Sequence, residues 1–156
     1  MTKAWRIVRK KRLPDAFTGE GARLGGGRWN HVGTPVVYVS ETLSLAALEL
    51  FIHFTRKDIK LSKSLVAIPI EIPDSLKITE VSIKELKADW RMSPPSNSTK
   101  DIGTEWAQNG VSPILRVPSA VIPHEFNLVL NPKHSDFIMI KIGKEQSFML
   151  DERMWK

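Results

Sequence analysis

Residues 35–54, PVVYVSETLSLAALELFIHF, carry the strongest structural signal in the chain. The β-branched and aromatic residues at the start of this stretch predict a buried strand over Pro35–Ser40. Either Ser40 or Thr42 suits a helix N-cap, and the apolar run that follows predicts a helix over Thr42–Phe54. Because that helix is apolar on almost every side, we expect it to be a central, buried element.

Upstream of this stretch, the pattern predicts one short strand and a long loop. Trp5, Ile7 and Val8 are typical of a strand, and residues 9–27 have the composition of a loop. The loop ends in three consecutive glycines at positions 25–27, and consecutive glycines let a backbone approach a ligand closely.

Downstream, two further helices are predicted. Residues Ser82–Glu85 have the form of a capping box, which should begin a short helix. Residues 92–100, MSPPSNSTK, are the most loop-like stretch of the chain. A helix over Lys100–Asn109 should follow, with Gly110 just beyond its end.

The strands predicted downstream are short apolar runs: Leu65–Ile72, Pro113–Val117, Phe126–Leu130 and Phe137–Ile142. Pro69 favours a sheet edge or a bulge, and Asn131–Pro132 should form the turn between the last two strands. Strands and helices do not alternate regularly, so the order indicates an α+β fold rather than a doubly wound one. We expect a compact single domain over residues 1–156, with a mixed or antiparallel sheet and a central buried helix.

The composition restricts the classes of function. The 156 residues include no cysteine, which removes thiolate zinc sites, cysteine nucleophiles and iron–sulfur clusters and fits a reducing cytoplasm. No apolar run has the length of a signal peptide or a membrane span, so we expect a soluble cytoplasmic protein without a membrane partner. The net charge of +6 favours a phosphorylated ligand, a nucleic acid or an acidic protein as partner.

Glu49 is the most informative single residue, because a carboxylate inside an apolar helix is costly to bury unless it is paired or used. A structural role is one interpretation, with the carboxylate bonded to a backbone N–H, to His53 or to an arginine. The functional interpretation places Glu49 at the floor of a cleft.

Three other residues are candidates for a binding site. Arg28 follows the glycines, and its planar guanidinium suits a pyrophosphate, although glycine-rich turns beside an arginine are common. Tyr38 lies in an aliphatic strand, where core packing is the default. Ser119 follows a predicted strand and offers a hydroxyl to a ribose or a phosphate, or it simply forms a turn.

Metal and hydrolase signatures are missing from the sequence. The histidines, His31, His53, His124 and His134, have no metal-ligand spacing, and there is no HExxH motif. A GxSxG elbow is also absent. We therefore expect no metal site.

In order and spacing, several short motifs resemble the RES domain, a family named for an arginine, a glutamate and a serine. These motifs are Trp5-Arg6-Ile7, GGGRWN at 25–30, VYVSE at 37–41, AALE at 46–49, Val117-Pro118-Ser119, NLVLNP at 127–132, Asp136-Phe137 and DERMW at 151–155. Residues 74–108 match nothing distinctive, so no role is transferred there.

The resemblance implies an NAD⁺-degrading toxin of the RES/Xre toxin–antitoxin type, related in fold to ADP-ribosyltransferase toxins. It makes Arg28, Glu49 and Ser119 the defining catalytic trio and Tyr38 a fourth residue of the cleft. As additional lining residues it suggests Arg6 and Asn127. NAD⁺ is then the substrate, and no cofactor is expected.

A mechanism follows from these residue types. Nicotinamide leaves NAD⁺ as a neutral molecule, so the enzyme has to stabilise a positively charged ribose rather than supply a general acid. We expect Glu49 to bond a ribose hydroxyl and offset that charge, as the second carboxylate of a glycosidase does. Arg28 should bind the pyrophosphate, Tyr38 should flank the nicotinamide, and Ser119 should bond ribose or phosphate.

The acceptor, the partners and the class of activity stay open at this point. Water would make the enzyme a glycohydrolase, inorganic phosphate a phosphorylase, and a protein side chain an ADP-ribosyltransferase; we favour NAD⁺ depletion. The resemblance implies an Xre-like antitoxin that masks the site and is compatible with a homodimer. Nucleic acid is expected only through the antitoxin, although a nucleic-acid-binding or ribonuclease toxin, or a non-catalytic interaction module, is the rival interpretation.

Overall fold

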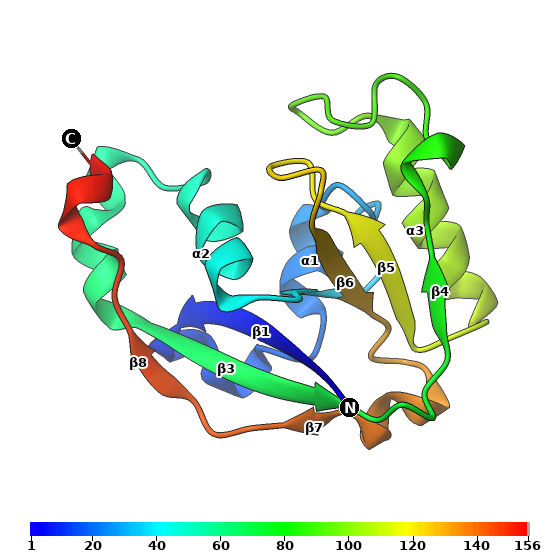
Figure 1. Ribbon diagram of the computed structural model, residues 1–156, viewed down its shortest axis with the longest axis horizontal. Helices are drawn as coiled ribbons and strands as arrows, with labels where there is room; N and C mark the ends of the chain where they lie inside the picture. Colours follow the sequence, from blue (N-terminus) through cyan, green and yellow to red (C-terminus); the bar gives the residue numbers. More distant parts are fainter. Residues whose placement is uncertain (156) are drawn as a thin grey trace.

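Eight strands form one curled sheet in the computed structural model, which describes residues 1–155 except the side chains of Ile59, Leu61, Ser62 and Trp155. The order of the strands is β4-β5-β6-β2-β1-β3-β7, and β8 also pairs with β3. Their bounds are β1 Thr2–Arg9, β2 Val37–Ser40, β3 Leu65–Ile72, β4 Ile78–Glu80, β5 Ile114–Pro118, β6 Phe126–Leu130, β7 Lys141–Ile142 and β8 Gln146–Phe148. The pair β4 and β5 is parallel, and the other recorded pairs are antiparallel. In Figure 1, β1 and β3 run across the view whereas β4 and β5 stand upright, which shows the curl.

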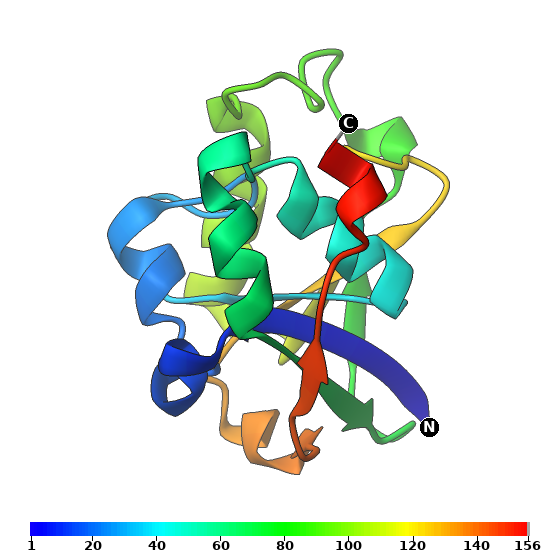
Figure 2. The same ribbon diagram turned by 90° about the vertical axis from the view of Figure 1, so that its left-hand side faces the viewer.

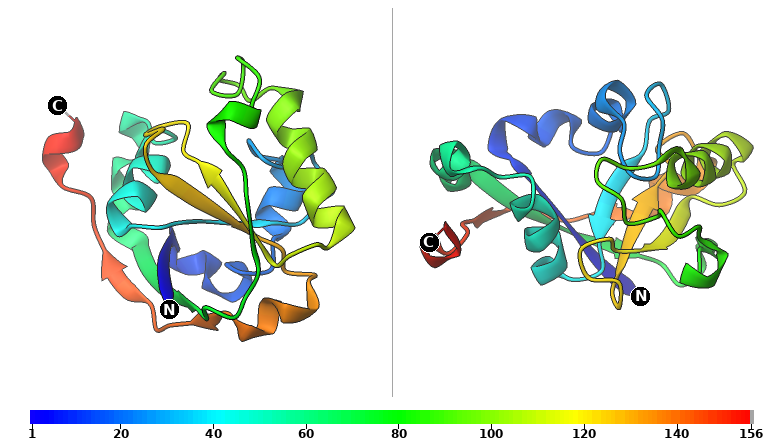
Figure 3. Two further views of the ribbon diagram at one scale, coloured as in Figure 1. Left: turned by 45° about the vertical axis from the view of Figure 1, so that its right-hand side comes forward. Right: turned by 90° about the horizontal axis from the view of Figure 1, so that it is seen from above.

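Three α-helices and five 3₁₀ helices accompany the sheet: α1 Glu20–Gly25, α2 Leu43–Phe51, α3 Asn97–Asn109, η1 Lys10–Asp15, η2 Arg56–Ser64, η3 Ile83–Glu85, η4 Ser135–Met139 and η5 Glu152–Trp155. In Figure 1 and the left view of Figure 3, α2 lies to the left and α3 to the right of β5 and β6, and both cover the face of the sheet that carries Asn127 and Val129. Among the helices of residues 1–155, none is both long and apolar enough to cross a membrane.

The sheet buries a hydrophobic cluster on each of its faces, because side chains alternate along every strand. One cluster gathers around β1, β2, β3 and β6 and includes Ala4, Val37, Val39, Ile70, Leu128 and Leu130. The other lies under α3 and includes Trp29, Trp106, Leu115, Val117 and Val129. The side chain of Tyr38 packs against this second cluster. The end of β2, the end of β5 and the start of β6 lie next to one another in the sheet, since Asn127 pairs with Ser40 on one side and Val117 on the other, and the second cluster packs beside them.

The α+β class is confirmed, and so are several element bounds. The strands β3 and β6 have the bounds that the sequence predicts. Thr42, rather than Ser40, caps α2, since its hydroxyl accepts a hydrogen bond from the Leu45 amide at 3.1 Å. The helix α3 starts three residues earlier than predicted, and Gly110 ends it with a left-handed φ of 61°.

The helix after β2 is less buried than the sequence predicts. This helix, α2, ends at Phe51, and its buried residues are Leu45 and Ala46. It packs on β1 and β2 with one side, and the apolar residues on its other side stay partly exposed. Ile52, just beyond the helix, is 55% exposed. Apolar composition all round a helix thus overestimated its burial.

Three other predictions are also corrected. Residues 9–27 are not one loop but contain η1 and α1, and within α1 Arg23 pairs with Glu20. Half of the strand predicted over Phe137–Ile142 lies in the 3₁₀ helix η4, which His134 caps by accepting from the Asp136 amide, and only its end, Lys141–Ile142, is a strand, β7. The sheet contains β4 and β8, which the sequence did not predict.

Pro69 marks a bulge rather than a sheet edge: β3 is paired on both sides, and between Ala67 and Ile70 three steps on β3 face four on the partner, from Gln146 to Ile142. On one side, the pairing of β3 changes from β8 at Ala67 to β7 at Ile70. Pro69 lies at that change, where its carbonyl accepts from the Gly143 amide at 2.8 Å. A residue in an antiparallel strand points its N and its C=O to the same side, so the missing N–H falls where the ladder is interrupted.

Candidate active site

Glu49 stands on α2 opposite the ends of two neighbouring strands. Its Oε1 accepts a hydrogen bond from the Ser119 hydroxyl at 2.7 Å and another from Asn127 Nδ2 at 2.6 Å. Ser119 directly follows β5, and Asn127 lies on β6. Hydrogen bonds to a carboxylate are shorter and stronger than neutral ones. Among the side chains and main chain that the structure describes, Oε2 has no hydrogen-bond partner, so this half-buried carboxylate keeps one oxygen for a ligand.

Ser119 uses its whole hydrogen-bonding capacity inside the protein. Its hydroxyl donates to Glu49 and accepts from the amides of Val121 and Ile122, both at 3.1 Å. A hydroxyl has one donor and two acceptor sites, so all three are occupied. The residue is also fully buried, with 0% exposure. Ser119 therefore fixes the carboxylate and the turn after β5 at the same time.

Asn127 links the Glu49 carboxylate to β2. While its Nδ2 donates to Glu49, its Oδ1 accepts from the hydroxyl of Ser40 at 2.6 Å. Ser40 lies directly opposite Asn127 in the ladder between β2 and β6, which puts both side chains on one face. The sequence offered Ser40 only as a helix cap, because its position across from Asn127 depends on a strand register that the sequence does not reveal.

Arg28 lies near Glu49 and is held from the opposite direction. Its Nη1 donates to the carbonyls of Trp90 at 2.8 Å and Met92 at 2.9 Å. Burial lowers the pKa of Arg28 below its usual value, and the charge of Glu49 opposes that shift, so each group lies within the electrostatic range of the other. Nε and Nη2 have no acceptor among the described parts of the chain, which leaves one edge of the guanidinium for an anion.

Tyr38 shapes the loop that carries Arg28. Its hydroxyl donates to Asn30 Oδ1 at 2.6 Å and accepts from the Trp29 amide at 3.0 Å. Burial raises the pKa of Tyr38, which keeps the hydroxyl protonated and able to donate. A Cβ added to Gly27 would lie 2.7 Å from this hydroxyl oxygen, so the close approach of the loop to Tyr38 requires glycine there.

Asn30 closes the same loop from inside and has 0% exposure. Its Nδ2 donates to the backbone carbonyls of Ala22, His31 and Thr34. The helix α3 presses on the loop from outside, since a Cβ on Gly103 would lie within 1.7 Å of the Trp29 carbonyl oxygen. The sequence analysis singled out GGGRWN as a motif but assigned no role to Asn30, because the carbonyls that Asn30 binds come together only in the folded loop.

Arg6, suggested by the resemblance as a lining residue, is not brought to this site. Trp5 pairs with Ser40 and so lies on the face of the sheet that carries Ser40 and Asn127. Arg6 is the next residue along β1, so its side chain points to the opposite face. It donates to the carbonyls of Ala16 at 2.7 Å and Tyr38 at 2.8 Å, and burial lowers its pKa to about 10. Its contacts tie η1 and β2 together and indicate a structural role.

The site thus unites five of the six residues suggested in the sequence analysis, Arg28, Tyr38, Glu49, Ser119 and Asn127, and shows Asn127 to be a direct partner of Glu49. It also depends on the carbonyls of Trp90 and Met92, which lie in the stretch that matched no motif. A main-chain contact across 62 residues leaves no trace in the side-chain pattern. Among residues 1–155 there is no cluster of three or more potential metal ligands.

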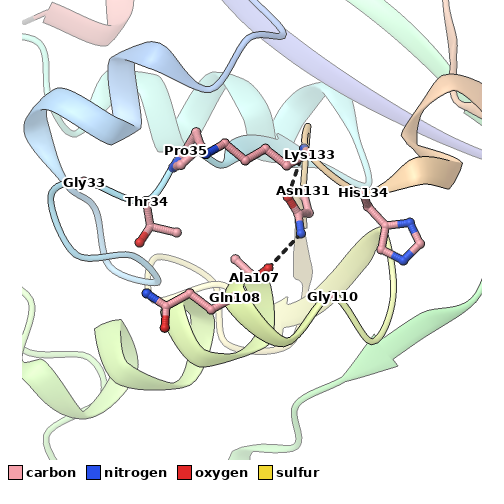
Figure 4. A pocket seen from close by; sticks show the side chains of 9 residues that line it. All are labelled: Gly33, Thr34, Pro35, Ala107, Gln108, Gly110, Asn131, Lys133 and His134. Carbon is pink, nitrogen blue, oxygen red and sulfur yellow. Dashed lines mark hydrogen bonds between the residues drawn. The ribbon is translucent and has the colours of Figure 1, made fainter.

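A separate cavity of about 390 Å³ lies between α3 and the turn after β6, away from Glu49 (Figure 4). Asn131 forms part of its wall and donates through Nδ2 to the carbonyl of Ala107 at 3.0 Å. None of Arg28, Glu49 and Ser119 lines this cavity. The cavity is therefore distinct from the Glu49 site.

Comparisons with known proteins agree on one family. Residues 3–151 match the family model of the RES domain. The chain is 39% identical to "Toxin Res" of Photorhabdus laumondii, with 97% of this chain and 96% of the relative covered. It is 37% identical to "Prs ADP-ribosylating toxin" of a Sphingobium species, with 98% and 96% covered. The fold is similar to that in the M. tuberculosis MbcT–MbcA toxin–antitoxin complex, with a TM-score of 0.77, 17% identity, and coverage of 99% of this chain and 86% of that one.

Proposed function

The chain belongs to the RES domain family, and from this premise we propose that it is a toxin that cleaves NAD⁺ at the bond between nicotinamide and ribose. One observation carries the proposal. The Glu49 carboxylate is held through a single oxygen by Ser119 and Asn127, while Arg28 stands within its electrostatic range. This arrangement offers one negative and one positive group to a ligand that carries both charges.

The chemistry of the bond suits a lone, well-fixed carboxylate. When the bond from ribose C1′ to the nicotinamide nitrogen breaks, both electrons stay with the nitrogen and the ribose becomes an oxocarbenium-like cation. Glu49 Oε2 is the oxygen that would accept a hydrogen bond from a ribose hydroxyl and stabilise this cation. Because Ser119 and Asn127 fix Oε1 beforehand, little reorganisation is needed in the transition state.

The other site residues divide into ligand-binding and positioning groups. Arg28 would bind the pyrophosphate through the edge that does not contact Trp90 and Met92. Ser119 was expected to touch ribose or phosphate, but its hydroxyl is saturated and buried, so we assign it to positioning Glu49. The Tyr38 hydroxyl is similarly engaged, so only the ring of this residue is offered to the nicotinamide.

Transfer of ADP-ribose to a protein is the second candidate activity. The observation that favours it is the 37% identity to a relative named as an ADP-ribosylating toxin of Prs. Both activities share the cleavage step and differ only in the acceptor that attacks C1′. Glu49 and Arg28 would have the same roles in each.

An antitoxin is the partner that this function requires. The similar fold in a toxin–antitoxin complex supports such a partner, and we propose that an Xre-like protein silences the enzyme by covering Glu49 and Arg28. Co-expression with the antitoxin should abolish NAD⁺ turnover by the purified complex. Full turnover by that complex would contradict masking of the site.

Incubation of the purified protein with NAD⁺ tests the activity. The products are separated by mass after reaction in buffer alone, with inorganic phosphate, or with a purified Prs protein. Nicotinamide with ADP-ribose identifies hydrolysis, a phosphorylated ADP-ribose identifies phosphorolysis, and a mass increase of the added protein identifies transfer. Intact NAD⁺ under all three conditions would contradict the proposal.

Two variants make the assay specific for the site. Glu49→Gln should lose the reaction, since it removes the charge and keeps the shape. The matched control is Glu105→Gln, the same change at an exposed position of α3. If both variants retained activity, Glu49 would have no part in the reaction.

A further inference from the structure

Two short segments carry a net charge equal to that of the whole chain. Residues 9–15 and 56–64 contain eight Lys or Arg and two Asp, a net charge of +6, which equals the total for the protein. The remaining residues have fifteen charges of each sign. The positive charge is therefore concentrated in these two segments.

The fold brings the two segments together. The helix η1 follows the last residue of β1, and η2 precedes the first residue of β3. These two strands are antiparallel partners, and Arg9 at the end of β1 lies opposite Leu65 at the start of β3. Both 3₁₀ helices are therefore attached to the same end of the strand pair, where Figure 2 shows η1 below the lower end of η2, and Asp58 of η2 lies within the electrostatic range of Arg9. We call the surface of residues 9–15 and 56–64 the basic face.

Most of the basic side chains are open to solvent. Seven are exposed: Lys10, Lys11, Arg12, Arg56, Lys57, Lys60 and Lys63. The two acidic residues, which interact with Arg12 and Arg9, still leave these segments with a net charge of +6. Asp15 lies 3.8 Å from Arg12, and Asp58 is engaged in capping η2 through the amide and hydroxyl of Thr55. Concentrated charge of one sign raises the local concentration of an oppositely charged partner.

Charges from the C-terminal part of the chain lie beside the basic face. The strand β8 pairs with the start of β3, and residues 151–153 follow it. Asp151 and Arg153 form an ion pair at 2.9 Å and cancel each other, which leaves the charge of Glu152. Glu145 shares the wall of a pocket with Leu13 and Pro14 and adds a second negative charge, and these two charges do not offset the net charge of +6 on the basic face.

The composition of the basic face fits phosphates better than a protein surface. The centre of a protein interface is rich in aromatic residues and poor in lysine. The large exposed hydrophobic residues found among the described side chains all lie outside residues 9–15 and 56–64. Phosphate contacts in protein–nucleic acid complexes come mainly from Lys, Arg and small polar side chains, and they carry no base information.

From this arrangement we propose that the basic face binds the phosphate backbone of a nucleic-acid duplex without reading its sequence. The proposal goes beyond the action on NAD⁺ and does not depend on it. It differs from the expectation that nucleic acid is reached only through the antitoxin. In a toxin–antitoxin assembly on DNA, this face would add a sequence-independent contact to the one made by the antitoxin.

Salt-dependent binding to a short DNA duplex of mixed sequence tests the proposal. Fluorescence anisotropy with the full-length protein should detect binding that weakens steeply between about 50 and 200 mM salt. Changing Lys10, Lys11, Lys57 and Lys60 together to Gln should lower the affinity at least about tenfold. The slope of log K against log salt should become shallower by up to about 0.9 for each phosphate that the variant no longer neutralises.

A matched variant separates the location of the charge from its total. Changing the exposed residues Lys77, Lys84, Lys87 and Lys141 to Gln gives the same net charge but leaves the basic face intact. This variant should keep the affinity within about threefold and the original salt slope. Thermal unfolding confirms that both variants are folded, and the double variant of Lys57 and Lys60 repeats the test if the fourfold one unfolds.

Three results would overturn the proposal. The first is no binding of the wild-type protein to the duplex at low salt, and the second is an equal reduction of affinity in both fourfold variants. The third is tighter binding to anionic lipid vesicles or to a polyglutamate peptide than to the duplex. That result would assign the face to a membrane surface or to an acidic protein.

Discussion

Glu49 and Arg28 carry the two opposite charges of the site, and the protein holds them in different ways. Side chains, those of Ser119 and Asn127, hold the carboxylate. Main-chain carbonyls, those of Trp90 and Met92, hold the guanidinium. One substitution removes a side-chain donor, but none removes a carbonyl. A single substitution of Ser119 or Asn127 can therefore disturb the position of Glu49, whereas the position of Arg28 depends on the backbone conformation of the segment that contains Trp90 and Met92.

The two regions also differ in where their support comes from. Glu49 on α2 is held by a chain of hydrogen bonds through Asn127 to Ser40, and these two residues lie opposite each other on adjacent strands of the sheet. The Arg28 loop is fixed instead by Tyr38 and by the close packing of Gly103 of α3. Substitutions near Glu49 should therefore change the rate of the chemical step, and substitutions near Arg28 should change substrate binding.

The largest effect is expected for Glu49→Gln. The amide keeps an oxygen that accepts from Ser119 and Asn127 but loses the charge, so kcat for nicotinamide release should fall by about 10²–10³. The free energy of unfolding should stay within about 1 kcal/mol of the wild type, as measured in urea. A fully active variant, or one that unfolds, would show that Glu49 is a structural carboxylate.

Arg28→Lys should have the next largest effect. A lysine keeps the positive charge but lacks the planar fork that contacts two carbonyls through Nη1 and that, by the proposal above, would bind the pyrophosphate through its other edge. Losing a charged hydrogen bond of about 1.5–3 kcal/mol should raise KM for NAD⁺ by roughly 10- to 100-fold, with a smaller change in kcat. Steady-state kinetics separate the two constants. A pure loss of kcat would place Arg28 in the chemical step and remove the contrast with Glu49.

Ser119→Ala should have a moderate effect on both rate and stability. It removes one donor to Glu49 and leaves the buried amides of Val121 and Ile122 without their acceptor. We expect kcat to fall about tenfold, KM to change little, and stability to fall by about 1–3 kcal/mol. The exposed Ser147→Ala is the matched control. A rise in KM alone would instead indicate direct contact between Ser119 and NAD⁺.

Tyr38→Phe should have the smallest effect, a few-fold rise in KM and about 1 kcal/mol of lost stability, because it removes the hydrogen bonds of the hydroxyl to Trp29 and Asn30.

The pKa of Tyr38 is raised in the folded protein, so the unfolded chain ionises first as the pH rises past about 10. The stability contributed by the hydroxyl is complete below that pH and is lost above it. The difference between wild type and variant in urea should shrink from pH 8 to pH 11, and a constant difference would contradict this.

The sequence predicts the fold well where a local signal is strong. The apolar runs of β3 and β6 and the Gly110 end of α3 are local signals, and the structure has them where expected. The depth of α2 was overestimated because an apolar helix shows no preferred side, and its burial depends on how many neighbours pack on it. The short strands β4 and β8 depend on distant partners and carry little local signal.

The candidate site shows the same limit. Glu49 was recognisable because a carboxylate is unusual in an apolar helix, and Arg28 because it follows three glycines. Their partners were not recognisable to the same degree. The contact between Ser40 and Asn127 requires a strand register, and the contacts of Arg28 with Trp90 and Met92 involve only backbone atoms of the partner. The identity of the side chains therefore predicted the two charged residues of the site, Glu49 and Arg28, but not the groups that hold them in place.

A double-mutant cycle on Glu49 and Ser119 determines whether Ser119 acts by holding the carboxylate. The rate of nicotinamide release is measured for the wild type, Ser119→Ala, Glu49→Gln and the double variant. We predict that Ser119→Ala lowers the rate about tenfold in the wild type but less than about twofold beside Glu49→Gln, because the charge that it positions is gone. An equal loss in both backgrounds would show that Ser119 and Glu49 act independently and would contradict a positioning role for Ser119.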